Sequence, residues 1–185
     1  MPDRVAFEEC IDLVLRLDDM EPALPRPRRL ERLFRDLSRF HPRQPAYEVQ
    51  DLIWAIWTNH EDAYADEAME QAINAIALKD YDIAHLVLDA LVAARPEWAE
   101  AWNKRATLNF IRGDDARAVD DIMETLRREP RHFGAISGFA QICLRHGRHA
   151  DALIAFEAAL AINPHLEGVA ALVAEMHANG GRVLH

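Results

Sequence analysis

Apolar side chains recur every three or four residues along most of this chain, the spacing that places them on one face of an α-helix. Between residues 99 and 112, for example, Trp102, Ala106 and Phe110 each lie four positions apart. The same kind of spacing continues through residues 116–128. Glycine or proline follows these stretches, where a helix is expected to stop. The pattern predicts an all-α protein.

A second regularity is an internal repeat. Pro96, Pro130 and Pro164 are equally spaced along the chain, and Gly113 recurs as Gly147 at the same step. Small residues keep this step at two further positions, where paired helices must approach closely: Ala72, Ala106 and Ala140, and then Ala84, Ala118 and Ala152. A fixed period of this length indicates stacked copies of one supersecondary unit.

Each unit has the layout of two helices joined by a tight turn. In the clearest copy, a helix over residues 99–112 ends at Gly113, which accepts a left-handed backbone without a Cβ clash. Asp114 or Asp115 then caps a second helix, which extends to Arg128. The next unit repeats this scheme. The first unit is more degenerate, because Lys79-Asp80 replaces the glycine turn.

These features resemble the tetratricopeptide repeat (TPR), a 34-residue pattern of a leading aromatic residue, small helix-B residues and a terminal proline. The matching residues are Trp102, Ala118 and Pro130 in one unit and Ala152, Phe156 and Pro164 in the next. Arg105, Ala106 and Asn109 depart from the pattern, as does Ile136 in place of tryptophan. The resemblance covers roughly residues 28–176 and extends to a group of small bacterial TPR proteins without assigned chemistry. It implies an α-solenoid of antiparallel helical hairpins.

The solenoid is expected to have additional helices at both ends. We divide the chain into an N-terminal helical segment and cap (1–64), a degenerate first repeat (65–98), a second repeat (99–132), a third repeat (133–166), and a C-terminal capping helix with its tail (167–185). The N-terminal segment is expected to cap the first repeat. Residues 3–19 form an amphipathic stretch that either packs within its own chain or exchanges with a second subunit.

The charge balance excludes some partner classes. The chain carries 31 acidic and 21 basic residues, a net charge of −10, so its surface repels nucleic acid and anionic membranes. A local arginine cluster between Arg26 and Arg39 is interpreted as the solvated face of a helix. No segment is long and apolar enough for membrane insertion. We expect a cytoplasmic protein, or a periplasmic one if an export leader precedes this sequence.

The resemblance implies a partner-binding face on the concave side of the solenoid, which the first helix of each hairpin lines. The expected residues are Asn103, Lys104, Thr107, Phe110, Ser137, Gln141 and Arg145. Their uncharged polar groups suit hydrogen bonding to a peptide backbone, and Lys104 and Arg145 suit a carboxylate. The alternative is an ordinary solvated surface with the C-terminal helix folded into it.

No sequence pattern indicates catalysis or a cofactor. Phosphate loops, dinucleotide-binding glycines and zinc-protease or nucleophile-elbow motifs are all missing, and Cys10 and Cys143 are isolated. The expected function is therefore a non-enzymatic module that binds a peptide or helix of a partner protein, without a cofactor or metal. One alternative is a self-assembling structural protein that forms a homodimer through its N-terminal helix or the groove. Another is a metal- or ligand-responsive regulator that uses histidines near the turns, such as His132, His146, His149 and His165.

Overall fold

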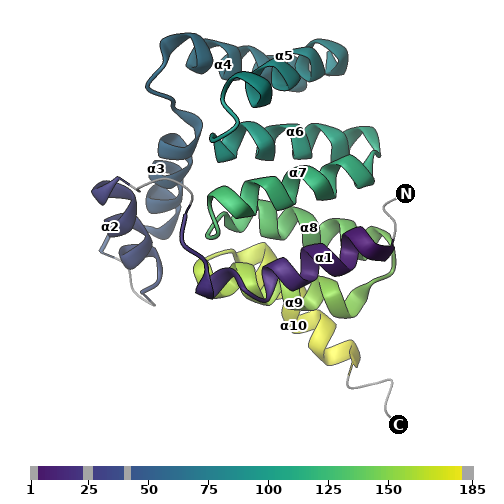
Figure 1. Cartoon of the computed structure of the whole chain (residues 1–185). Helices are drawn as coiled ribbons and strands as arrows, with labels where there is room; N and C mark the ends of the chain where they lie inside the picture. The colour runs from purple at the N-terminus through teal and green to yellow at the C-terminus, as the bar shows by residue number, and fades with distance from the viewer. Residues whose placement is uncertain (1–3, 23–26, 40–42, 181–185) are drawn as a thin grey trace.

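The computed structural model describes residues 4–22, 27–39 and 43–180, and in these ranges it contains only helices (Figure 1). They are α1 (Arg4–Val14), the 3-10 helix η1 (Leu17–Asp19), α2 (Arg28–Leu37), α3 (Ala46–Thr58), α4 (Ala63–Ala77), α5 (Tyr81–Ala94), α6 (Ala99–Arg112), α7 (Asp115–Arg128), α8 (Phe133–Arg145), α9 (His149–Ile162) and α10 (Glu167–Gly180). The expected all-α solenoid is confirmed.

Three hairpins form the body of the solenoid: α4 with α5, α6 with α7, and α8 with α9. We call the first helix of each hairpin the A helix and the second the B helix. The turn residues are Lys79, Gly113 and Gly147, with φ of 61°, 78° and 71°, so all three turns use the left-handed conformation. Lys79 therefore takes the backbone geometry that glycine supplies in the other two units.

Small residues allow the close approach within each hairpin. The six repeated alanines are buried, from 0 to 3% exposed: Ala72, Ala84, Ala106, Ala118, Ala140 and Ala152. Each following A helix then packs on the preceding B helix, α6 on α5 and α8 on α7. The C-terminal helix α10 packs on α9 in the same manner, so it extends the stack where the A helix of a fourth repeat would stand.

The helix α1 packs against α7 and α9, the B helices of the second and third repeats. Its residues Phe7, Ile11 and Val14 are buried in the same hydrophobic cluster as Val119 and Met123 of α7. The expectation that the whole N-terminal segment caps the first repeat is therefore wrong for α1. The physical reason is that α7 carries apolar side chains on its outer side, and these need a cover of their own.

The helices α2 and α3 form a further hairpin beside the joints between the repeats. Phe34 of α2 and Ile53 and Trp57 of α3 form one core with Phe133, which begins α8. The indole Nε1 of Trp98 donates a 2.8 Å hydrogen bond to the carbonyl of Trp57, which ties α3 to the start of α6. This hairpin thus braces the edge of the solenoid where the A helices begin (Figure 1). The expectation that it caps the first repeat is also wrong, because its core is shared with Phe133 at the start of α8.

None of the described helices combines the length and the apolar composition that crossing a bilayer requires. The thiols of Cys10 on α1 and Cys143 on α8 are both buried and unpaired. Burial raises the pKa of Cys10 well above its usual value and that of Cys143 to about 12, so both thiols are poor nucleophiles.

The left-handed turn at Lys79 gives a first prediction. Lys79→Gly should raise the free energy of unfolding by about 0.5–1 kcal/mol. A left-handed L-residue costs about 1–2 kcal/mol, and the extra chain entropy of glycine offsets about half of that gain. Urea unfolding followed by circular dichroism measures the difference. Lys79→Ala is the matched control, because it removes the same side chain but keeps the Cβ atom. An equal effect of both substitutions would contradict the strain at this turn.

Candidate interaction surface

The seven residues expected on the binding face lie on two A helices. Four lie on α6 (Asn103, Lys104, Thr107 and Phe110) and three on α8 (Ser137, Gln141 and Arg145). Their accessibility differs. The side chains of Thr107, Gln141 and Arg145 are exposed, whereas Asn103 is buried and the other three are half-buried. Thr107 and Gln141 are separated by one period of the repeat and so hold the same position in consecutive units.

A buried ionic network accounts for Lys104 and Asn103. The Nζ atom of Lys104 lies 3.0 Å from Oε1 of Glu100, and Nδ2 of Asn103 donates to Oε2 of Glu100 at 3.1 Å. The third partner of this carboxylate is Nε2 of His132, 2.8 Å from Oε2. The side chains of Glu100 and His132 are both 0% exposed. The main role of Lys104 is therefore to pair with a buried carboxylate of its own chain, not to present a free charge at the surface.

The surroundings of His132 settle the position of its proton. Its Nδ1 accepts a 3.1 Å hydrogen bond from the backbone N–H of Ala135 and caps α8, so in the neutral ring Nε2 carries the hydrogen that points at Glu100. The imidazole stacks on Trp57, with ring centroids 4.2 Å apart and planes 13° apart. The edge of Trp54 closes the same pocket. The network thus joins α3, α6 and α8.

The electrostatics of Glu100 follow from these contacts. Burial by itself raises the pKa of a carboxyl group, but the hydrogen bonds and electrostatic attraction from His132 and Lys104 outweigh it. The pKa of Glu100 is lowered as a result, and the group is a carboxylate at neutral pH. Full enclosure of the carboxylate and the imidazole leaves no room for a substrate, so this cluster holds helices together.

Arg145 is also paired within the chain. Its Nη1 atom lies 2.6 Å from Oδ1 of Asp115, and Nε2 of His146 lies 2.8 Å from Oδ2 of the same carboxylate. The guanidinium also covers the ring of Phe110 at 3.8 Å and donates to the Phe110 carbonyl. Both cations expected to accept a partner carboxylate, Lys104 and Arg145, therefore already pair with carboxylates of this chain.

Two departures from the TPR pattern have a common explanation on the other side of α6. Arg105 binds Asp121 with two hydrogen bonds of 2.7 and 3.0 Å, and Asn109 donates to the same carboxylate at 2.9 Å. Arg105 also reaches Asp89 on α5 at 2.9 Å. Polar residues stand at these positions because they pair α6 with α7 through the buried carboxylate of Asp121, and with α5 through Asp89. Burial of Asp121 outweighs its hydrogen bonds and raises its pKa.

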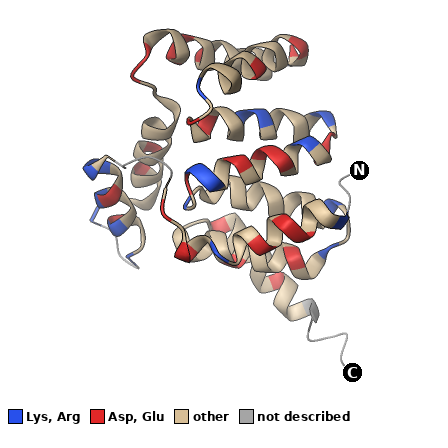
Figure 2. Cartoon of the chain, in the orientation of Figure 1, with Lys and Arg blue, Asp and Glu red and all other residues tan. Residues whose placement is uncertain are grey.

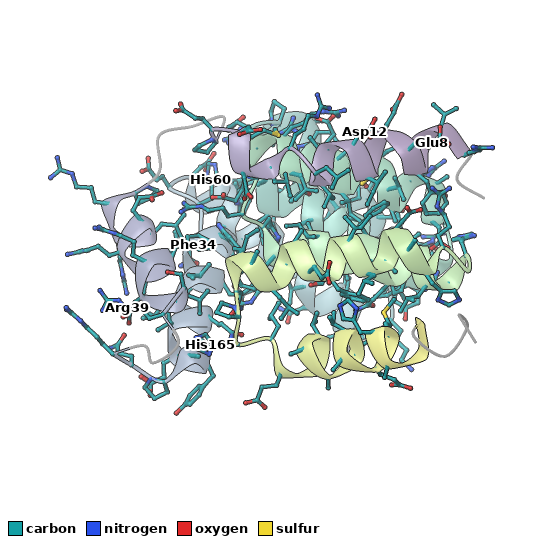
Figure 3. The ribbon with its side chains drawn as sticks, turned by 90° about the horizontal axis from the view of Figure 1, so that it is seen from below. Glu8, Asp12, Phe34, Arg39, His60 and His165 are labelled. Carbon is teal, nitrogen blue, oxygen red and sulfur yellow. The ribbon has the colours of Figure 1, made fainter. Side chains whose placement is uncertain are left out.

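Three of the four histidines expected near the turns make hydrogen bonds. His132 and His146 bind Glu100 and Asp115, and Nε2 of His165 lies 2.9 Å from the carbonyl of Arg39, two residues labelled in Figure 3. Within the described ranges, no three His, Cys, Asp or Glu side chains gather in an arrangement suited to a metal ion.

Sequence comparisons agree with this architecture. The family model for the tetratricopeptide repeat matches residues 69–125 and 116–167. A TPR repeat-containing protein of Rhizobium etli is 38% identical over 136 residues, which cover 74% of this chain and 67% of that protein. The chain belongs to the tetratricopeptide repeat family. Such repeats generally mediate protein–protein interactions, and the family is typically non-catalytic.

The Glu100 network gives a second prediction. Glu100→Gln should lower the free energy of unfolding at pH 7 by about 2–3 kcal/mol, because it removes a charged hydrogen-bond acceptor from a buried site. The lowered pKa means that the carboxylate's contribution is complete above the unfolded-state pKa of about 4.3 and is lost as the pH falls through the folded-state value. The difference between the two proteins should therefore shrink below about pH 4.3.

Urea unfolding at a series of pH values tests this prediction. Glu97→Gln is the control, because Glu97 is an exposed glutamate near the same joint and should have little effect. A loss of stability that is equal at neutral and acidic pH would contradict an ionic role for Glu100.

Proposed function

We propose that this chain is a non-enzymatic interaction module that binds a peptide or helix of a partner protein on its A-helix face, the concave face of a TPR solenoid. One observation carries the proposal. The helix α1 occupies α7 and α9 on the B-helix side of the second and third repeats, whereas Thr107 and Gln141 are exposed on the A helices of the same repeats.

The chemistry of recognition follows from what remains available on this face. The Lys104 and Arg145 cations hold α6 and α8 in place through Glu100 and Asp115. Hydrogen bonding to a partner backbone then falls to Thr107, Ser137 and Gln141. A surface fixed in advance binds without the entropy cost of ordering its own side chains, which favours a preformed groove over an induced one.

The ion pairs decide which experiment is informative. Reversal of both cations, Lys104→Glu with Arg145→Glu, would place like charges beside Glu100 and Asp115 and would destabilise the fold. A loss of binding in this variant could then come either from the destabilised fold or from the loss of a direct contact with the partner. Substitutions at Thr107 and Gln141 avoid this problem, because their side chains are exposed and hold no charge.

A third prediction uses a photo-crosslinking residue, p-benzoylphenylalanine, at position 141. Exposure to light in native cell extract should attach a partner protein at this site, and mass spectrometry identifies it. The control places the same residue at Asp12, which is exposed on α1 and points away from the A helices (Figure 3). The partner should then lose affinity for a Thr107→Arg/Gln141→Arg variant that keeps the helical circular dichroism of the wild type. Attachment at position 12 alone, or equal attachment at both sites, would contradict the A-helix face.

A second candidate function is self-assembly, and it rests on the outer side of the first repeat. Tyr64 and Leu86 are 82 and 73% exposed there. They border an apolar groove of about 290 Å³ between α4 and α5 that also includes Ala68, Val87 and Ala90. A terminal repeat usually presents a polar outer face. An apolar one favours a second copy of this chain, joined through the same face of each subunit.

A fourth prediction tests this candidate by light scattering after size-exclusion chromatography. The wild-type chain should form a dimer at micromolar concentration, and Leu86→Asp should convert it to a monomer, because the charge would be buried in the contact. Leu15→Asp is the matched control, since Leu15 is 63% exposed but lies beyond this groove, at the end of α1. A wild-type monomer at every concentration, or a dimer that survives Leu86→Asp, would contradict this assembly. Photo-crosslinking at position 141 tests the A-helix face separately, whether the chain is a monomer or a dimer.

A further inference from the structure

The arginines of this chain are distributed unevenly. Seven of the 21 basic residues fall between Arg26 and Arg43, together with only two acidic residues, Glu31 and Asp36. The remainder of the chain holds 14 basic and 29 acidic residues. Figure 2 shows basic positions along α2 at one edge of a molecule whose other helices carry many acidic ones. One short helix therefore has a charge opposite to that of the protein as a whole.

Five of these arginines border a groove on the α2–α3 hairpin. The groove has a volume of about 670 Å³, and we call it the arginine groove. Its cationic lining is Arg29, Arg32, Arg35, Arg39 and Arg43, and Asp36, 3.4 Å from Arg39, also lines it. Leu33 of α2 and Leu52 of α3 supply apolar surface between the guanidinium groups. The groove thus combines positive charge with an apolar strip.

Elsewhere in the chain, arginines are used in internal ion pairs. Those with a carboxylate partner include Arg95, Arg105, Arg112, Arg117, Arg128, Arg131, Arg145 and Arg148. In the part of the chain that the structure describes, Arg29 and Arg32 have no ion pair. The carboxylate of Glu31 on the same helix lies 2.6 Å from Arg131 of the repeat body. Glu31 thus anchors α2 to the repeats, while Arg29 and Arg32 stay on its solvent side.

We propose that the arginine groove binds an acidic segment of a partner protein, at least about three residues long and carrying an apolar side chain. The length follows from geometry. Within α2, Arg29 and Arg35 are separated by about 9 Å at 1.5 Å per helical residue, which an extended peptide spans with about three residues at 3.3 Å each. Guanidinium groups bind carboxylates through paired hydrogen bonds, and Leu33 and Leu52 offer contact to the apolar side chain.

The groove's size and surroundings favour a peptide over a nucleic acid. A single small anion would engage one or two of the five arginines. A nucleic acid is long and uniformly charged, so beyond this short groove its phosphates would face the acidic surface of the other helices. A peptide segment ends where the groove ends. This site is separate from the A-helix face and does not depend on what binds there.

The test uses the full chain and a fluorescein-labelled dodecapeptide, built from Asp and Glu with a leucine at every fourth position. Fluorescence anisotropy should show binding that weakens several-fold when NaCl rises from about 50 to about 300 mM. Arg29→Glu/Arg32→Glu should weaken it about tenfold or more. The control Arg112→Glu/Arg117→Glu makes the same change of charge on exposed arginines of the repeats and should bind as the wild type does.

Circular dichroism establishes that both variants are folded, and a Gln141→Arg variant should bind the peptide unchanged. Three outcomes would overturn the proposal: no binding at about 100 µM peptide, equal losses in both double variants, or a single-stranded 20-nucleotide DNA that binds more tightly than the peptide. Concentration-dependent self-association that only Arg29→Glu/Arg32→Glu removes would also overturn it, since a second copy would then supply the acidic segment.

Discussion

A buried carboxylate, that of Glu100, sets the arrangement around which the other parts of this molecule are placed. Removing a charge from water costs several kcal/mol, and only close partners compensate for it. Glu100 has three such partners, Asn103 and Lys104 on its own helix and His132 at the start of α8. Because His132 must keep both its contact with Glu100 and its cap on α8, the beginnings of α6 and α8 have a fixed separation. The ring of Trp57 stacks on the same imidazole, which fixes α3 as well.

This constraint explains how a short solenoid supports several distinct surfaces. With α3 held at the joint between the second and third repeats, α2 lies at the outer edge, where its arginines face solvent. The helix α1 covers α7 and α9. Thr107 and Gln141 on the A helices stay exposed, as do Tyr64 and Leu86 on the outer side of α4 and α5. The available surfaces therefore differ in character: uncharged and polar on α6 and α8, cationic on α2, and apolar at the first repeat.

Much of the fold was predictable because it depends on local signals. The period of the repeat places the hairpins, and the alanines at fixed steps identify where helices touch. Even the weakest turn follows this rule, since Lys79 takes the left-handed conformation that its position in the repeat requires. The position of α1 was not predictable in the same way. Its apolar face fits many surfaces, and no periodic signal links residue 7 to residues 119 and 123.

The candidate surface shows the same division between local and long-range information. The resemblance to the TPR family placed Thr107 and Gln141 on one face, but the pairing of Lys104 and Arg145 depends on contacts that the resemblance does not specify. One signal was present in the sequence. His132 stands where Trp98 and Leu166 stand in the neighbouring units, so a titratable ring occupies an otherwise apolar position. A polar group at such a site needs a buried partner, and Glu100 is that partner.

The pairing of charges also limits which residues can take part in recognition. If Lys104 moved away to bind a partner, the buried carboxylate of Glu100 would lose a counter-charge and the fold would be destabilised. Lys104 is therefore held in place more firmly than its partial exposure suggests. Arg29 and Arg32 have no ion pair within the described part of the chain, so they can bind a partner's carboxylate without breaking an internal contact. Recognition of charge is therefore better suited to α2 than to the A helices, where uncharged side chains remain available. The two surfaces differ in chemistry because the network around Glu100 has already used the cation that α6 presents on the binding face.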